Sequence, residues 1–312
     1  MKIIDIENNF MNVVKEVNLK SNYYWILANT NEIEKLDEFI TIDSESMKDC
    51  KEFSKSAKIS FFNEYTFAIF NVLSYVDNII VSKELYVFLS KKYIITVYRD
   101  TMNILNELIT DIKESKNCFI LKDKPQVDIL LYYILDRIII RNYDIISELE
   151  TQVDRIEISI LKSPEKEQLY NLITLRRQVY KIRKYLNPLR HIGDSLNLND
   201  NFIIEKDSLK YFIGINKKIE KLIGAVESLV QDLAMVREAF ESEAANKTNE
   251  LMKIFTVVTS IFMPLNLITS MYSMQLNGTP FINVKNGYHY VIMLMVLIAF
   301  ILIMIFRKKK WI

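Results

Sequence analysis

Residues 254–274 read IFTVVTSIFMPLNLITSMYSM, an uncharged stretch about as long as the ~20 residues that a helix needs to cross a bilayer core. A second uncharged stretch, YHYVIMLMVLIAFILIMIF, follows at residues 288–306. Soluble proteins rarely need two such runs so close together. The sequence therefore predicts two transmembrane helices, joined by a polar loop at residues 275–287.

The orientation of these spans is predicted by the basic tail at residues 307–312, which begins Arg307-Lys308-Lys309-Lys310. Positively charged residues that flank a span tend to stay on the cytoplasmic side. With two spans, both the N- and the C-terminus are then cytoplasmic, and the loop faces outward. We therefore expect a multi-pass protein of the cell (plasma or inner) membrane, with lipid as a partner.

Composition excludes several other classes. The net charge is +1, which gives no reason to expect nucleic acid as a partner. Cys50 and Cys118 are the only cysteines, and His191 and His289 the only histidines, so a zinc site of the usual ligands is not expected. No phosphate-binding glycine loop or nucleophile elbow is present, and the chain is not expected to be an enzyme.

The region before the spans divides into two parts. Residues 1–125 alternate short β-rich runs with turns and predict a cytoplasmic α/β domain. Strands are expected near 23–27, 58–62, 66–73, 84–89 and 93–98, and helices near 7–18, 30–40 and 101–115.

From residue 126 the pattern is helical. Residues 126–207 predict an antiparallel helical hairpin whose second arm begins at 165 and stops at Asn187-Pro188. From residue 208 the helical period continues without a break into the first span. We expect one helix over 208–274, on the order of 100 Å long. Such a helix needs neighbours along its length, in a bundle or an oligomer.

A polar line follows the first span in steps of three and four residues. On a helix this spacing places the side chains on one face. The line is a helix–helix seam or the lining of a water-filled path formed by several copies of the chain. Its members are Asn249, Met252, Thr256, Thr259, Met263, Asn266, Ser270 and Ser273.

Several motifs resemble the CorA family of magnesium and divalent-cation transporters. They are the runs at 246–256, 261–265 and 271–275, together with Pro280, Gly287-Tyr288 and the basic tail ending in Trp311. The segment LRRQVYKIRKYLNPLR at 175–190 is similar to the basic arm of that family's helical hairpin.

The resemblance implies a funnel-shaped homopentamer with a cytoplasmic α+β domain built as an α/β/α sandwich. The hairpin, the long stalk helix and the two spans would follow. It implies influx of Mg²⁺, with Co²⁺ or Ni²⁺ as companions, driven by membrane potential and without a resident cofactor. The pore would be lined or gated by Asn249, Met252, Phe255, Thr256, Thr259, Met263, Asn266 and Ser270.

Two departures from the family pattern bear on function. The signature Tyr-Gly-Met-Asn at the outer mouth reads here Tyr272-Ser273-Met274-Gln275. In the stalk, the family has aspartates that bind regulatory magnesium. The matching stretch of this sequence contains Gly214 and Lys217 instead. Two alternatives follow, namely a zinc transporter of the related branch and a non-conducting membrane scaffold or regulatory subunit.

Overall fold

The protein is described from a computed structural model that covers residues 1–8, 10–13, 22–38, 40–52, 56–76, 79–274, 280 and 286–311. It divides into two compact units. Unit 1 comprises Met1–Ser159 and Glu165–Arg237, and unit 2 comprises Ile160–Pro164 and Glu238–Ile312. The long helix α6 (Leu209–Ser273) contributes to both units.

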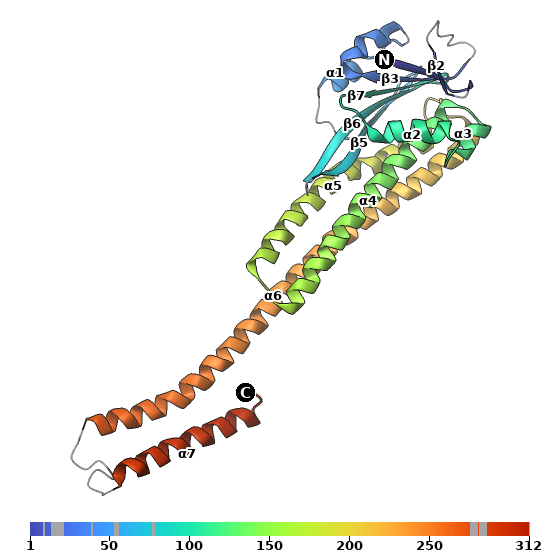
Figure 1. The fold of residues 1–312 in the computed structure, drawn as a ribbon. Coiled ribbons are helices and arrows are strands. Elements are labelled where there is room, and N and C mark those ends of the chain that lie inside the picture. Colours follow the sequence, from blue (N-terminus) through green and yellow to red (C-terminus); the bar gives the residue numbers. More distant parts are fainter. Residues whose placement is uncertain are drawn as a thin grey trace. The chain divides into compact units, whose positions relative to one another are not determined.

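Unit 1 is built on a seven-stranded sheet with the order β2-β1-β3-β7-β6-β5-β4 (Figure 1). Only β3 and β7 pair in parallel, and all other neighbours are antiparallel. The strands are β1 (Lys2–Asp5), β2 (Met11–Asn12), β3 (Tyr24–Asn29), β4 (Lys58–Phe61), β5 (Thr66–Val76), β6 (Ile79–Leu89) and β7 (Tyr93–Tyr98).

Both faces of the sheet are covered. One face packs its side chains into a core shared with the 3-10 helix η1 (Thr30–Glu38) and α1 (Ser44–Lys51). The other face meets the helix α5, which contacts β4, β5 and β6. A strand covered on both faces reads as a nearly continuous apolar run, as in β3, where the first five residues are buried. The predicted α/β/α sandwich is therefore confirmed.

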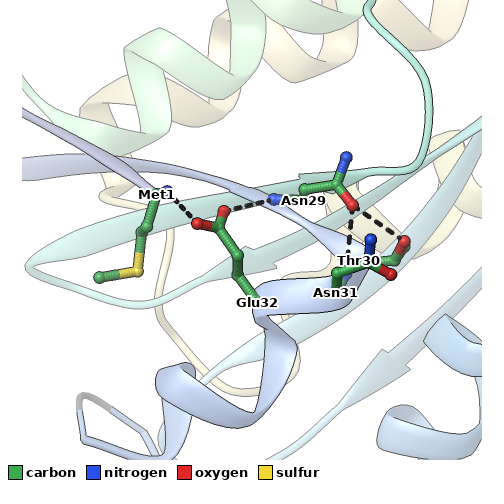
Figure 2. Close-up of polar contacts among 5 residues, drawn as sticks. All are labelled: Met1, Asn29, Thr30, Asn31 and Glu32. Atoms are coloured by element: carbon green, nitrogen blue, oxygen red, sulfur yellow. Dashed lines mark hydrogen bonds and ion pairs between the residues drawn. The ribbon is translucent and has the colours of Figure 1, made fainter.

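The start of η1 is held by a cluster of polar contacts that Figure 2 shows. The Glu32 carboxylate accepts hydrogen bonds from the Met1 ammonium and from the Asn29 backbone N–H. The contact with the ammonium is the main reason why the pKa of Glu32 lies below its usual value. The Asn29 side-chain oxygen in turn accepts from Thr30 and Asn31. These contacts fix the turn that leads from β3 into η1.

The helices of unit 1 include α2 (Asn103–Lys113), α3 (Phe119–Asp123), α4 (Val127–Lys162) and α5 (Lys166–Leu198). The short helix η2 (Lys206–Ser208) precedes α6 (Leu209–Ser273). The long stalk helix predicted from the sequence is thus confirmed, and α6 runs without interruption into the first apolar stretch. The last helix is α7 (Gly287–Lys308).

Two expectations about helices were wrong. Helix α5 does not stop before Pro188 but continues ten residues beyond it, to Leu198. Proline removes one backbone donor, yet Leu186, Leu189 and Ile192 are buried around it, and their packing offsets that loss. The helix expected near 7–18 is also absent from its described part, where Met11–Asn12 forms β2. Residues 14–18 lie outside the described residues.

Candidate functional site

Two helices of the described chain, α6 and α7, are long and apolar enough to cross a membrane. They correspond to the two stretches that the sequence singled out. In the membrane part of α6, the partly or fully buried positions recur in steps of three or four residues and define one face. The centre of this face is formed by Val257, Ile261, Pro264, Ile268 and Tyr272, and Ser260 and Leu265 lie at its edges.

A matching face occurs on α7, where half-buried residues recur at Val291, Met295, Ile298, Leu302 and Phe306. The end of α7 lies close to α6, because Trp311 lines a cleft of about 540 Å³ together with Asn249, Met252 and Thr256. The two helices therefore belong to one hairpin-like unit, and each presents one face inward.

The polar line lies on the opposite face of α6. All of its members are exposed, from Asn249 to Ser273 at the end of the helix. The structure thus separates the α6 surface into a half-buried apolar face and an exposed face with amides and hydroxyls. Apolar side chains on or beside the line are exposed as well, with Met252 at 59%, Phe255 at 65% and Met263 at 77%.

Two threonine hydroxyl groups of this face donate their protons to backbone carbonyls of the same helix. The Thr256 hydroxyl donates to the Met252 carbonyl at 2.7 Å, and the Thr259 hydroxyl donates to the Phe255 carbonyl. Since each hydroxyl has a single proton, its remaining lone pairs are left to accept hydrogen bonds from outside the helix. The line therefore presents oxygen acceptors and no formal charge, which suits the donating water shell of a cation.

The outer end of the site is only partly described. Helix α6 ends at Ser273, and the Tyr272 hydroxyl donates to the Pro280 carbonyl at 2.7 Å. Ser273 does not have a positive φ, so the side chain that replaces the family's glycine causes no left-handed strain there. Gln275 and the loop residues Phe281 and Lys285 lie outside the described residues. The tie to Pro280 is not evident from the sequence, because it depends on how the loop folds back.

The replaced regulatory stretch lies in unit 1, near the start of α6. Lys217 is exposed, and a Cβ atom added at Gly214 would meet nothing within 4 Å. Lys210 is exposed about one turn before Gly214, and Lys221 is exposed about one turn after Lys217. This face of α6 is therefore basic rather than acidic. Among the described residues, no group of three or more Asp, Glu, His or Cys side chains is arranged to hold a metal ion.

Sequence reasoning missed the inner end of the site. The cleft beside Asn249 is also lined by Glu243, Glu250, Lys253 and Trp311. A backbone bond from the Trp311 N–H to the Phe306 carbonyl and a stacked contact between the two rings turn the tail back toward α6. The helical period identified the residues of α6 that line the cleft. It carried no information about the position of Trp311, which lies far away in the sequence.

Comparison with known proteins gives a consistent result. Residues 20–308 match the family described as "CorA-like Mg2+ transporter protein". The chain is 27% identical over 284 residues to the "Cobalt/magnesium transport protein CorA" of Thermotoga maritima, covering 90% of this chain and 80% of that protein.

Two solved structures share the fold. The CorA magnesium transporter of Methanocaldococcus jannaschii superposes with a TM-score of 0.80 at 22% identity, covering 97% of this chain and 95% of that one. The full-length CmaX protein superposes with a TM-score of 0.74 at 18% identity, covering 99% and 97%. The likeness therefore extends over both units and includes α6 and α7.

Proposed function

The chain belongs to the CorA family of divalent-cation transporters, and we propose that it conducts hydrated Mg²⁺ into the cell through a pore lined by the polar line of α6. Family membership makes it a transporter rather than an enzyme. Co²⁺ and Ni²⁺ are proposed as companion ions, because a pore that binds an ion through its water shell discriminates weakly among ions of equal charge. Membrane potential would drive the inward movement.

One observation carries this proposal: the outward acceptors of the exposed α6 face. A hydrated divalent cation donates hydrogen bonds through its water molecules, and the Thr256 and Thr259 oxygens accept them. The Asn249 and Asn266 side chains, exposed on the same face, add amide oxygens. Because none of these groups is charged, they would hold the water shell without removing it.

A single α6 helix cannot enclose a path, so the proposal requires several copies of the chain. We propose a homopentamer in which the polar line of each α6 faces a common axis and α7 forms the outer ring. The apolar side chains Met252, Phe255 and Met263 would then narrow the path and gate it by excluding water. The half-buried face of α6, which carries Val257 and Ile268, is directed away from the line and suits contact with α7.

The proposed topology rests on the charges. Arg307, Lys308, Lys309 and Lys310 flank the end of α7, which supports a cytoplasmic location for this end. The α/β domain at 1–125, the hairpin at 126–207 and the start of the stalk helix at 208–274 would share that side. The spans would run at about 254–274 and 288–306, with the loop at 275–287 outside.

The altered signature supports a second candidate, a non-conducting scaffold or regulatory subunit. Gln275 keeps the amide of the family's asparagine but is one methylene longer, which would displace or narrow the ring at the mouth. Ser273 adds a hydroxyl at the last residue of α6. The related zinc transporters form a third candidate, since the signature varies in that branch too.

Flux measurements separate these candidates. The purified chain would be placed in liposomes that contain a metal-sensitive dye, and Mg²⁺, Zn²⁺ and Co²⁺ would be offered separately at a negative internal potential. We expect influx of Mg²⁺ and Co²⁺. Influx of Zn²⁺ alone would assign the chain to the zinc branch, and no influx of any ion would overturn the transporter proposal.

The matched control is the double variant Ser273→Gly, Gln275→Asn, which restores the family signature. If the unaltered chain is silent and the double variant conducts, the scaffold candidate is correct. If both conduct, the mouth tolerates the longer amide. Protein-free liposomes and liposomes held at zero potential give the background for each ion.

A further inference from the structure

The tip of the α4–α5 hairpin carries an exposed leucine in an otherwise anchored turn. Helix α4 ends at Lys162, and α5 begins at Lys166. Ile160 is fully buried, whereas the adjacent Leu161 is 61% exposed. Ile158, one turn earlier, is 56% exposed. A turn held in place by one apolar residue while its neighbours face outward is a candidate contact surface.

The same tip is tied to α6 close to the first span. The Lys247 ammonium donates a hydrogen bond to the Ser163 hydroxyl at 2.8 Å. Residues 160–164 belong to unit 2, together with the membrane part of α6. Lys247 precedes the first residue of the uncharged run, Ile254, by seven positions, which is about 10 Å along a helix. The interfacial layer on each side of a bilayer core is roughly 5–8 Å thick. The tip therefore lies about one headgroup layer away from the apolar core.

Charge at the tip itself is mixed, because Glu165 and Glu167 are exposed at the start of α5, whereas the segments beside the membrane end of α6 are mostly basic. Within residues 160–164, 246–256 and 307–311, Glu250 is the single acidic residue of the sequence. The basic residues of the same segments are Lys162, Lys247, Lys253, Arg307, Lys308, Lys309 and Lys310. Basic residues close to an anionic leaflet are attracted to it. Trp311, stacked on Phe306, adds an aromatic ring of the kind enriched at membrane interfaces.

We propose that the α4–α5 tip is a membrane-contacting element. Leu161 enters the interfacial layer of the leaflet that the basic residues face, and Lys162 binds the phosphate groups of anionic phospholipids. The contact couples the cytoplasmic hairpin to the bilayer beside the inner end of the α6 line. It rests on the proposed spanning of the bilayer by α6.

The experiment places an environment-sensitive, thiol-reactive fluorophore on Leu161→Cys. The native Cys50 and Cys118 are both buried, and burial raises the pKa of each thiol, so they should not react. Tyr170→Cys, on α5 and 69% exposed, is the matched control beyond the tip. Both proteins would be compared in nanodiscs of phosphatidylglycerol, in the same nanodiscs with brominated acyl chains, and in detergent.

We expect brominated lipid to quench the dye at 161 severalfold more than the dye at 170, with a blue shift that needs phosphatidylglycerol. Equal quenching at the two positions would overturn the proposal. A blue shift at 161 that persists in detergent, without quenching by brominated lipid, would also overturn it and assign the tip to contact with a second copy of the chain.

A separate labelling experiment tests the proposed topology. In intact cells, a membrane-impermeant maleimide should not label Leu161→Cys, and it should label the residue after permeabilisation. Labelling of intact cells would place the tip outside and contradict the topology. Quenching by brominated lipid would still decide whether the tip contacts the bilayer.

Discussion

Gly193 of α5 lies so close to Asn216 of α6 that a Cβ atom at residue 193 would be only 2.3 Å from the Asn216 side-chain oxygen. The Asn216 amide also donates to the Asp194 carboxylate at 2.9 Å, which limits its freedom to move away. Glycine at this position therefore allows the two helices to approach, and the contact lies near the start of α6, next to Lys217.

Replacing Gly193 by alanine should destabilise unit 1. The added methyl group would also come within 3.2 Å of Ile219. The Asn216 side chain must then move and give up its bond to Asp194, or the helices must separate, at a cost of about 1–3 kcal/mol. The matched control is Gly214→Ala, where the methyl group meets nothing and helix propensity improves by up to about 1 kcal/mol. Thermal unfolding of the full chain in detergent should show a lower Tm for the first variant and an equal or higher Tm for the second. Equal Tm values for both would contradict the close approach.

Thr256→Val should slow Mg²⁺ influx without unfolding the helix. Valine keeps the branched shape but removes the oxygen that accepts from the ion's water shell. A lost hydrogen bond of about 1 kcal/mol corresponds to a roughly fivefold change. Thr256→Ser should retain most of the influx in the liposome assay.

The control for this change is Thr269→Val. The Thr269 hydroxyl makes a similar bond to the Asn266 carbonyl at 2.9 Å, but residue 269 is not part of the polar line. Influx through this variant should be close to that of the unaltered chain. If both valine variants slowed influx equally, the effect would come from the helix and not from the lining of a path.

Protonation of Asp5 should make unit 1 less stable in acid. Burial alone would raise the pKa of this carboxyl, but hydrogen bonds from Asn22, Asn8 and the backbone of residues 7 and 8 outweigh it and lower the pKa. A group with a depressed pKa stabilises the fold above its unfolded value, which is about 3.9, and that contribution is lost as pH falls through the folded value.

The test is the variant Asp5→Asn, followed by thermal unfolding between pH 7 and pH 3. At pH 7 the variant should be less stable, by about 2 kcal/mol for hydrogen bonds to a charged group. Its stability should then fall less steeply toward pH 3 than that of the unaltered chain. Parallel curves for the two proteins would show that Asp5 does not titrate with folding.

The basic face around Lys217 should bind no magnesium. Three exposed lysines, Lys210, Lys217 and Lys221, repel a divalent cation where the family places carboxylates. Added Mg²⁺ should therefore not protect the part of α6 that belongs to unit 1 from limited proteolysis. The double variant Gly214→Asp, Lys217→Asp should gain protection, because an ion bound to the folded state stabilises it. If Mg²⁺ protected both proteins equally from proteolysis, the unaltered chain would still bind magnesium at this site, and the prediction would be wrong.

The local sequence pattern was sufficient to predict much of the architecture. The uncharged runs, the period of α6 and the short apolar runs of β3 and β7 each depend on neighbours within a few residues, and all of these elements are present. Pro188 shows where local rules fail. The rule that proline ends a helix ignores the burial of Leu186 and Leu189, which only the packed bundle supplies.

By itself, then, the sequence determined that the chain has two spans, that α6 is continuous and that one face of α6 is polar, since charge and periodicity are properties of a single segment. Only the tertiary structure decided which partners meet. It paired β3 with β7, brought Gly193 to Asn216, turned Trp311 back to Asn249 and tied Ser163 to Lys247. These contacts join residues far apart in the chain, and they form because packing many side chains together offsets the entropy of ordering the segments between them.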